Sequence, residues 1–220
     1  STDNQDTWVS QMNGYRKRKQ RTRFPRRIVV IVCEGLETER IYFEGYNERF
    51  SRVHVKPIHS GGTDARSIVK YAIEQRDNFG INIEEGDELW CVFDVDDKEE
   101  NEIRDMIEHG RSNGVKIALS NPSFELWYLL HFIYQESGID RNEVVERLKD
   151  EYIPGYTKNR DYNGILFPLT EGAINNAERL NAFHENMGID LDSKMSNPSS
   201  QVFKLVRAIK ELKERNRDRS

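Results

Sequence analysis

The sequence predicts an α/β protein with a parallel sheet of four strands, flanked by helices, and a helical extension at its C-terminal end. Short runs rich in apolar residues, at 27–33, 53–59, 89–93 and 115–119, have the length of strands. Segments with a helical pattern separate these runs, which is typical of strand–helix–strand units. The first and third runs do not alternate with polar residues, so we expect parallel strands that are buried on both faces.

Helices are expected between the strands and after the last one. They are predicted at residues 38–50, 64–79, 99–112, 124–134, 139–151, 171–187 and 199–214. Thr63 or Asp64 is the expected N-cap of the second helix, although the glycines in Ser60–Asp64 leave open a loop whose amides approach a phosphate. Three parts follow: a flexible basic arm (1–26), an α/β core (27–135) and a helical extension packed on the core (136–220).

The composition indicates a modest core, because 36% of the 220 residues are hydrophobic and 32% are charged. No apolar run approaches the length of a membrane span, and the first thirty residues lack the apolar stretch of a signal peptide. We therefore expect a soluble, cytoplasmic protein without a membrane partner. Cys33 and Cys91 fall inside predicted strands, which favours two small core residues over a disulfide or a zinc site.

The charge is unevenly distributed. The formal net charge is −5, yet eight of the residues in 16–27 are Lys or Arg, which leaves about −13 for the remainder. A basic arm of this kind can neutralise the phosphates of a nucleic acid, and such contacts make binding dependent on salt. The alternatives are a solubilising tail or a docking segment for an acidic protein. The candidate nucleic-acid contacts in the arm are Arg16, Lys17, Arg18, Lys19, Arg21 and Arg23.

Three acids directly follow the central apolar run. Asp94, Asp96 and Asp97 stand beyond the carboxyl end of a predicted parallel strand, where ligands collect in open α/β sheets. Carboxylates this close repel one another, and a bound Mg²⁺ or Mn²⁺ ion relieves the repulsion. The alternative is a solvated acidic turn that caps the next helix.

A second strand end also carries acids. Glu34 and Glu39 follow the first apolar run, and Gly35 permits a tight turn between the strand and the next helix. Two parallel strands that deliver carboxylates at the same edge would form a shared acidic pocket, with Glu34, Asp94, Asp96 and Asp97 as metal ligands.

Two later segments supply further candidates. Glu125 is an acid in the first turn of an apolar helix, so it either joins the acidic pocket or only complements the helix dipole. The segment 152–160 is aromatic and basic and contains Lys158 and Arg160. Such a loop can stack a base and neutralise a phosphate, or it can be an ordinary surface loop.

The pattern Glu34-Gly35-x-x-Thr38-Glu39 followed by Asp94-x-Asp96-Asp97 resembles a TOPRIM domain, the Mg²⁺-dependent catalytic module of topoisomerases, primases and OLD-type nucleases. The block Ser120–Phe132 is similar to the signature of the RloB-like proteins, a TOPRIM-like bacterial family tied to phage resistance and restriction loci and related to the abortive-infection AbiLii proteins. The resemblance covers about residues 26–210.

The resemblance implies a TOPRIM-like sheet and a metal-dependent nuclease that acts on DNA or RNA in anti-phage defence. Glu34 would be the general acid/base or a metal ligand, and Asp94 and Asp96 would bind metal. Lys158 matches a lysine of the family's C-terminal region, and Glu39 and Glu125 would assist catalysis. A neighbouring ATPase would be a protein partner.

Two other functions remain open. The Asp94-x-Asp96 motif also suits a Mg²⁺-dependent phosphoryl hydrolase acting on nucleotides or a phosphoprotein, although such enzymes place this motif on their first strand, whereas here Glu34 comes first. Outside the enzymes, the acidic site would bind metal without turnover in an effector or sensor that a defence ATPase controls.

Overall fold

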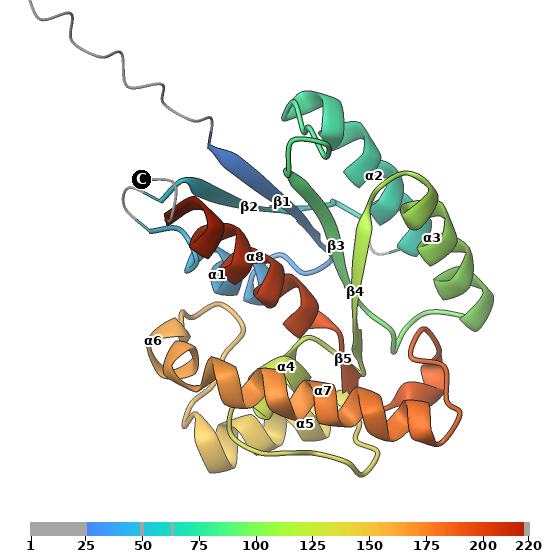
Figure 1. Ribbon diagram of the computed structural model, residues 1–220. Coiled ribbons are helices and arrows are strands. Elements are labelled where there is room, and N and C mark those ends of the chain that lie inside the picture. The colour runs from blue at the N-terminus through green and yellow to red at the C-terminus, as the bar shows by residue number, and fades with distance from the viewer. Residues whose placement is uncertain (1–25, 49–50, 63, 218–220) are drawn as a thin grey trace, which may run out of the picture.

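A single sheet forms the centre of the molecule in the computed structural model, which describes residues 26–48, 51–62 and 64–217 (Figure 1). The strand order is β2-β1-β3-β4-β5. The parallel strands are β1 (Arg27–Cys33), β2 (Val53–His59), β3 (Glu88–Asp94) and β4 (Lys116–Asn121), while β5 (Ser199–Ser200) pairs antiparallel with the end of β4. The predicted parallel sheet of four strands is confirmed, and β5 extends it.

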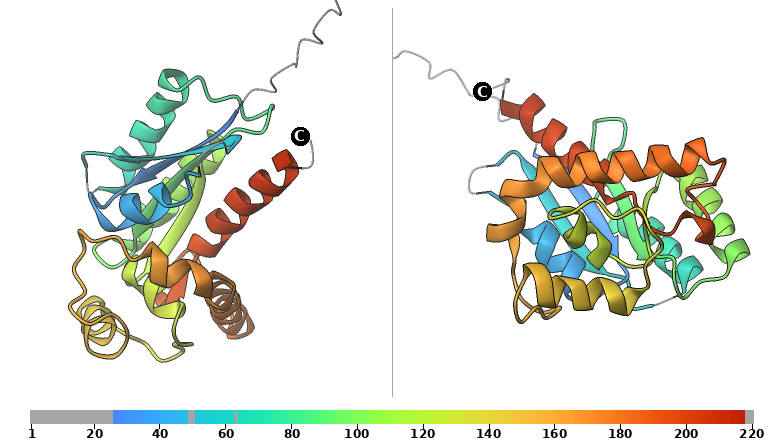
Figure 2. Two further views of the ribbon diagram at one scale, coloured as in Figure 1. Left: turned by 90° about the vertical axis from the view of Figure 1, so that its left-hand side faces the viewer. Right: turned by 90° about the horizontal axis from the view of Figure 1, so that it is seen from below.

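Helices cover both faces of the sheet (Figures 1 and 2). One face is covered by α2 (Ala65–Asn78) and α3 (Glu100–Ser112). On the other face, α1 (Thr38–Glu44) and α8 (Val202–Arg217) lie against the strands. The helices α4 (Glu125–Leu130), α5 (Arg141–Arg147), α6 (Asn163–Leu166) and α7 (Thr170–Asn186) belong to the same apolar cluster and pack beyond them, at the carboxyl ends of the strands. A π-helical segment, Leu148–Tyr152, continues α5. In the described part of the chain, no helix is long and apolar enough to cross a membrane.

Each face of the sheet has its own apolar core. Side chains of β1 and β3 point alternately to the two sides, so Ile31 and Val92 belong to one cluster and Val32 and Phe93 to the other. This alternation explains why the sequence of these strands is continuously apolar. Cys33 and Cys91 are buried, free and divided between the two clusters, as expected of core residues.

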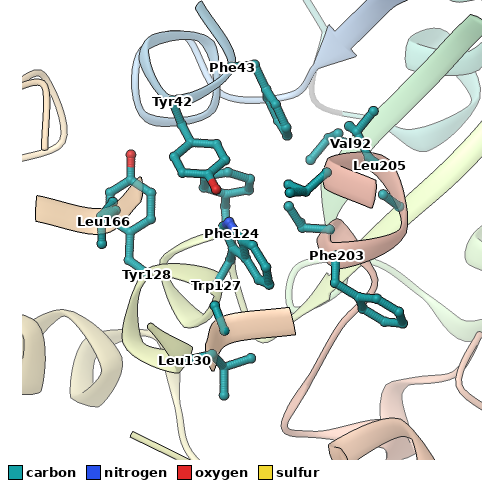
Figure 3. Packing of buried hydrophobic residues seen from close by; sticks show 14 of the residues in the cluster. Tyr42, Phe43, Val92, Phe124, Trp127, Tyr128, Leu130, Leu166, Phe203 and Leu205 are labelled. Atoms are coloured by element: carbon teal, nitrogen blue, oxygen red, sulfur yellow. The ribbon is translucent and has the colours of Figure 1, made fainter. Parts of the chain in front are cut away.

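The C-terminal third contributes to the larger of the two cores (Figure 3). Phe203 and Leu205 of α8 lie in the same cluster as Val92 of β3 and Trp127 of α4. At the other end of this face, the amide of Asn163 donates to the carbonyl oxygens of residues 41 and 42, at 3.1 and 3.4 Å. The helical extension therefore packs directly on the sheet and on α1.

The N-terminus of α2 is capped by acids. The carboxylate of Asp64 accepts a hydrogen bond from the amide of Ser67 at 2.9 Å, and Glu102 accepts one from the amide of Ala65 at 3.1 Å. The predicted N-cap Asp64 is confirmed. Because carboxylates occupy these amides, this helix end does not offer them to a phosphate.

Several predicted helix boundaries are wrong. The first helix ends at Glu44 instead of residue 50, because the side chain of Asn47 bonds both backbone groups of Val55 and draws the chain back to β2. The helix from 124 ends at Leu130 instead of 134. Ser199 begins a short strand, not a helix, since it pairs with Asn121 and its hydroxyl bonds another serine.

Candidate functional site

The candidate site lies at the topological switch point of the sheet, where successive strands stop being added on one side of β1 and begin to be added on the other. Strand β1 has β2 on one side and β3 on the other, so a crevice opens beyond the carboxyl ends of β1 and β3. Glu34 directly follows β1, and Asp94 is the last residue of β3. A cavity of about 690 Å³ lies here, and Glu125 at the start of α4 also lines it. The fold thus brings acids from three elements into one cavity.

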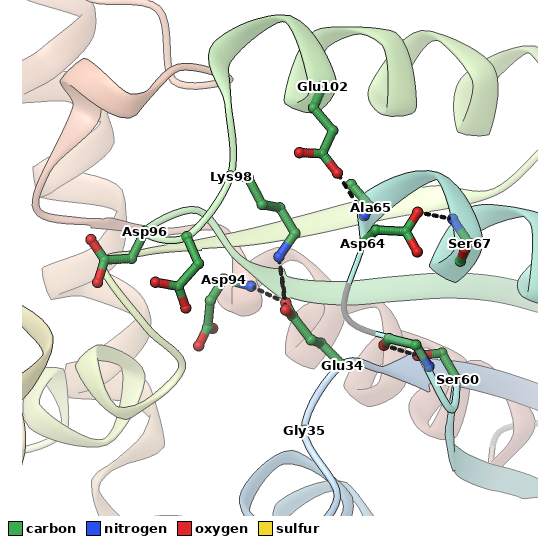
Figure 4. Close-up of polar contacts among 12 residues, drawn as sticks. Glu34, Gly35, Ser60, Asp64, Ala65, Ser67, Asp94, Asp96, Lys98 and Glu102 are labelled. Atoms are coloured by element: carbon green, nitrogen blue, oxygen red, sulfur yellow. Dashed lines mark hydrogen bonds and ion pairs between the residues drawn. The ribbon is translucent and has the colours of Figure 1, made fainter.

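Glu34 is held by an ion pair and a backbone amide (Figure 4). The ammonium group of Lys98 lies 2.8 Å from one carboxylate oxygen of Glu34 and 2.9 Å from the other. The amide of Asp94 donates to the same carboxylate at 3.0 Å, which ties the end of β1 to the end of β3. The Lys98 side chain is only 3% exposed, so this pair is a buried one.

Glu39 lies in the first turn of α1, where the amide of Gly35 donates to its carboxylate at 3.2 Å. Gly35 permits this close approach, since a β-carbon here would overlap the Glu39 carboxylate unless that side chain moved. Burial, followed by the charges of Glu125 and Glu34, raises the pKa of Glu39 to about 7. Among the described residues, no basic side chain forms an ion pair with Glu39.

Asp94 is held between two segments. One carboxylate oxygen accepts from the amide of Phe124 at 2.9 Å, and the other lies 3.2 Å from the guanidinium of Arg141 in α5. Burial raises the pKa of Asp94 well above the usual aspartate range, and the charges of Glu39 and Glu125 raise it further. Arg141 opposes this shift and does not cancel it.

Glu125 is 3% exposed and forms an ion pair with Lys158 across the cavity, at 2.9 Å. Its second oxygen accepts from the hydroxyl of Ser123 at 2.8 Å. The backbone carbonyl of Lys158 accepts from the hydroxyl of Thr38, so the aromatic and basic loop is tied to α1 beside the cavity. Glu125 and Lys158 thus line the same cavity as Glu34 and Asp94.

The other predicted site residues in the described part of the chain are more exposed than this group. The side chains of Asp96 and Asp97 are 46% and 71% exposed, and Arg141 contacts both. Asp97 lines the cavity and Asp96 does not; in Figure 4 the Asp96 carboxylate is turned away from Lys98. Arg160 is exposed. The predicted arm contacts, Arg16, Lys17, Arg18, Lys19, Arg21 and Arg23, lie outside the described residues.

The donor set of the cavity consists of carboxylate oxygens. Over residues 26–48, 51–62 and 64–217, no group of three His, Cys, Asp or Glu side chains converges as a preformed cage for a metal ion. The acids nevertheless lie near enough for Glu34, Glu39 and Glu125 to raise the pKa of Asp94. A cation bound at Asp94 and Glu39 would relieve this repulsion, and Mg²⁺ needs only one or two carboxylates besides waters and phosphates.

Sequence reasoning missed two cations of the site. Lys98 directly follows the acidic turn 94–97, and this adjacency is a local signal that could have marked it. Arg141 carries no such signal, since 44 residues separate it from Asp97 in the chain. Only the packing of α5 against the end of the sheet brings the guanidinium to these acids.

This arrangement defines a class: a doubly wound α/β protein with an acidic cavity, containing the buried Lys98, at its topological switch point. A family model described as RloB-like protein matches residues 29–209, and the chain belongs to this family. No curated protein and no solved structure matches the chain.

Proposed function

We propose that this protein is a metal-dependent nuclease that hydrolyses phosphodiester bonds in DNA or RNA. The observation that carries the proposal is the gathering of four largely buried carboxylates, those of Glu34, Glu39, Asp94 and Glu125, around one cavity. Burial and the neighbouring carboxylates raise the pKa of Glu39 and of Asp94, and acids with a perturbed pKa concentrate at functional sites. The resemblance to TOPRIM nucleases supports the same reaction.

Mg²⁺ or Mn²⁺ fits this donor set, and Asp94, Glu39 and Glu34 are the residues that would hold it. The ion would supply Lewis-acid polarisation of the phosphate and a more acidic bound water. Asp96 and Asp97 would have a smaller part, because both are largely solvated and already contact Arg141.

The chain's own residues would orient the substrate and move a proton. Glu125, held by a hydrogen bond from Ser123, would accept the proton of the attacking water. Lys158, which is 55% exposed at the cavity, would contact the phosphodiester backbone together with Arg160. The basic arm at residues 16–23 would add further phosphate contacts and make binding dependent on salt.

The test is cleavage of DNA and RNA substrates by the purified protein in Mg²⁺, Mn²⁺ or EDTA. Metal-dependent cleavage should fall by about 100-fold or more in Glu34→Gln and Asp94→Asn, which remove a charge and keep the size. Asp105→Asn, on the exposed face of α3, is the matched control and should cleave as the wild type does. Cleavage that persists in EDTA, or in both site variants, would overturn the proposal.

A second candidate is a metal-binding effector that depends on a protein partner. The observation that favours it is that Asp94 and Glu125 each form an ion pair with a basic side chain of the protein itself, Arg141 and Lys158. Metal that raises the melting temperature of the wild type, and not of the Asp94→Asn variant, without any cleavage would support this function. Turnover that appears on adding a neighbouring ATPase would identify the partner.

Family membership supports the biological setting of the proposal. We place the nuclease in the cytoplasm of a bacterium, in abortive-infection defence against phage, beside such an ATPase. A loss of phage resistance in cells that carry the Asp94→Asn variant tests this setting independently of the reaction.

A further inference from the structure

We propose that Lys98 is the phosphate-binding residue inside the cavity and that Glu34 is a positioning residue for its ammonium group. This inference rests on the proposed nuclease and adds to it the group that binds the phosphate of the substrate.

The ammonium group of Lys98 is fixed by several contacts. It lies 2.8 and 2.9 Å from the two carboxylate oxygens of Glu34, and it sits 5.6 Å from the ring centre of Phe93. The amide of Lys98 bonds the carbonyl oxygen of Val95 at 3.1 Å, so a tight turn after β3 aims the side chain back at the end of β1. An ammonium group has three N–H donors, and its contacts with Glu34 leave capacity for one more acceptor.

The charges around the cavity show why a phosphate needs this group. Acids outnumber bases on the cavity wall, so a phosphodiester meets repulsion unless a cation lies next to it. Arg141 is shared among three aspartates, and more than half of the Lys158 side chain is exposed to water. Lys98 is 3% exposed, so among these three cations its charge is the least screened by solvent.

A purely structural ion pair is the alternative role for Lys98. Buried pairs are weak sources of stability, since desolvation offsets most of the attraction and apolar pairs of similar size are often as stable. If Lys98 only neutralises Glu34, then removing both charges together should leave the affinity of the cavity for phosphate unchanged. If Lys98 binds phosphate, the loss remains when Glu34 is also neutral.

The experiment is a calorimetric titration with inorganic phosphate in Mg²⁺ buffer, run on the full chain. The variants are Lys98→Met, the double variant Glu34→Gln with Lys98→Met, and Lys98→Arg. Lys70→Met, an exposed lysine on α2, is the matched control. Urea unfolding confirms that each variant is folded, and the double variant covers the case in which an unpaired Glu34 destabilises the single one.

We expect the affinity for phosphate to fall by at least about 10-fold in both variants that lack the ammonium group. The affinity should fall less in Lys98→Arg and stay unchanged in Lys70→Met. Wild-type affinity in the double variant, or no phosphate binding by the wild type, would overturn the inference. Lys98-dependent phosphate binding without any cleavage leaves the inference standing and removes the nuclease. Wild-type phosphate affinity in the double variant, together with metal-dependent cleavage by the wild type that falls in Asp94→Asn, removes the inference and leaves the nuclease standing.

Discussion

Replacing Glu39 with glutamine should stabilise the metal-free protein at alkaline pH. Glutamine keeps the size of the side chain and the acceptor for the Gly35 amide, and it removes a charge that the site disfavours. The pKa of Glu39 rises from about 4.5 to about 7 on folding, because the carboxylate is buried and lies near Glu125 and Glu34. Each pKa unit corresponds to about 1.4 kcal/mol, so the ionised form costs about 3 kcal/mol.

The sign of the effect follows from proton linkage. Between about pH 4.5 and 7 the folded protein keeps a proton on Glu39 that the unfolded chain has released, so wild-type stability falls as the pH rises through this window. Above about pH 7 the ionised Glu39 lowers the free energy of unfolding by the full amount, about 3 kcal/mol. At about pH 5 it lowers it by less than about 1 kcal/mol. The stabilisation by Glu39→Gln should therefore grow with pH.

The assay is urea unfolding in EDTA at about pH 5 and pH 8, followed by tryptophan fluorescence. Glu44→Gln is the control, because this glutamate lies on the same helix with an exposed side chain paired to Arg40, and its effect should stay below about 1 kcal/mol. A Glu39→Gln variant that is destabilised, or that differs from the wild type equally at both pH values, would refute the assignment of a buried, repelled carboxylate.

Three further changes test other parts of the site. Gly35→Ala should displace the Glu39 carboxylate, lower the free energy of unfolding by about 1–3 kcal/mol and abolish cleavage; wild-type behaviour in urea and cleavage assays would contradict the close approach. Arg141→Gln should lower the free energy of unfolding in EDTA by about 1 kcal/mol, a small value because the Arg141 side chain is partly exposed. Mn²⁺ should restore this stability, because the ion and the guanidinium compete for Asp94. A variant that Mn²⁺ does not stabilise would argue against this competition. Asp96→Asn should reduce the rate less than about 10-fold while Asp94→Asn reduces it about 100-fold or more, and equal losses would show that both aspartates act in the reaction.

The strands were predictable because their signal is local. Runs such as Val29–Cys33 and Leu89–Phe93 are long enough for a strand and apolar on both faces. These features are visible in the sequence without knowledge of which helices pack on the strands. Helix ends were less predictable, since Asn47 stops α1 through bonds to a residue eight positions away. Strand β5 depends on pairing with β4 across the molecule, and nothing in Ser199–Ser200 alone indicates it.

The acids of the site were partly predictable for the same reason. Glu34 and Asp94 stand at strand ends that can be located in the sequence, and parallel strands deliver such residues to one edge. The partners of these acids were not predictable, because they come from turns and helices placed by tertiary packing. The spacing Asp94-x-Asp96-Asp97 alone does not show that Asp94 enters the cavity while Asp96 faces solvent.

The pairing of the acids argues for a ligand at Glu39. The cavity carboxylates of Glu34, Asp94 and Glu125 each have a basic side chain within 3.2 Å, and within the described chain Glu39 has none. If these acids had only a structural role, an uncharged residue at position 39 would make the protein more stable, because the raised pKa of Glu39 indicates that the site disfavours its charge. A group that destabilises the free protein is instead expected where a bound cation or a proton transfer uses it, so a stabilising Glu39→Gln substitution that also abolishes cleavage would join both halves of this argument.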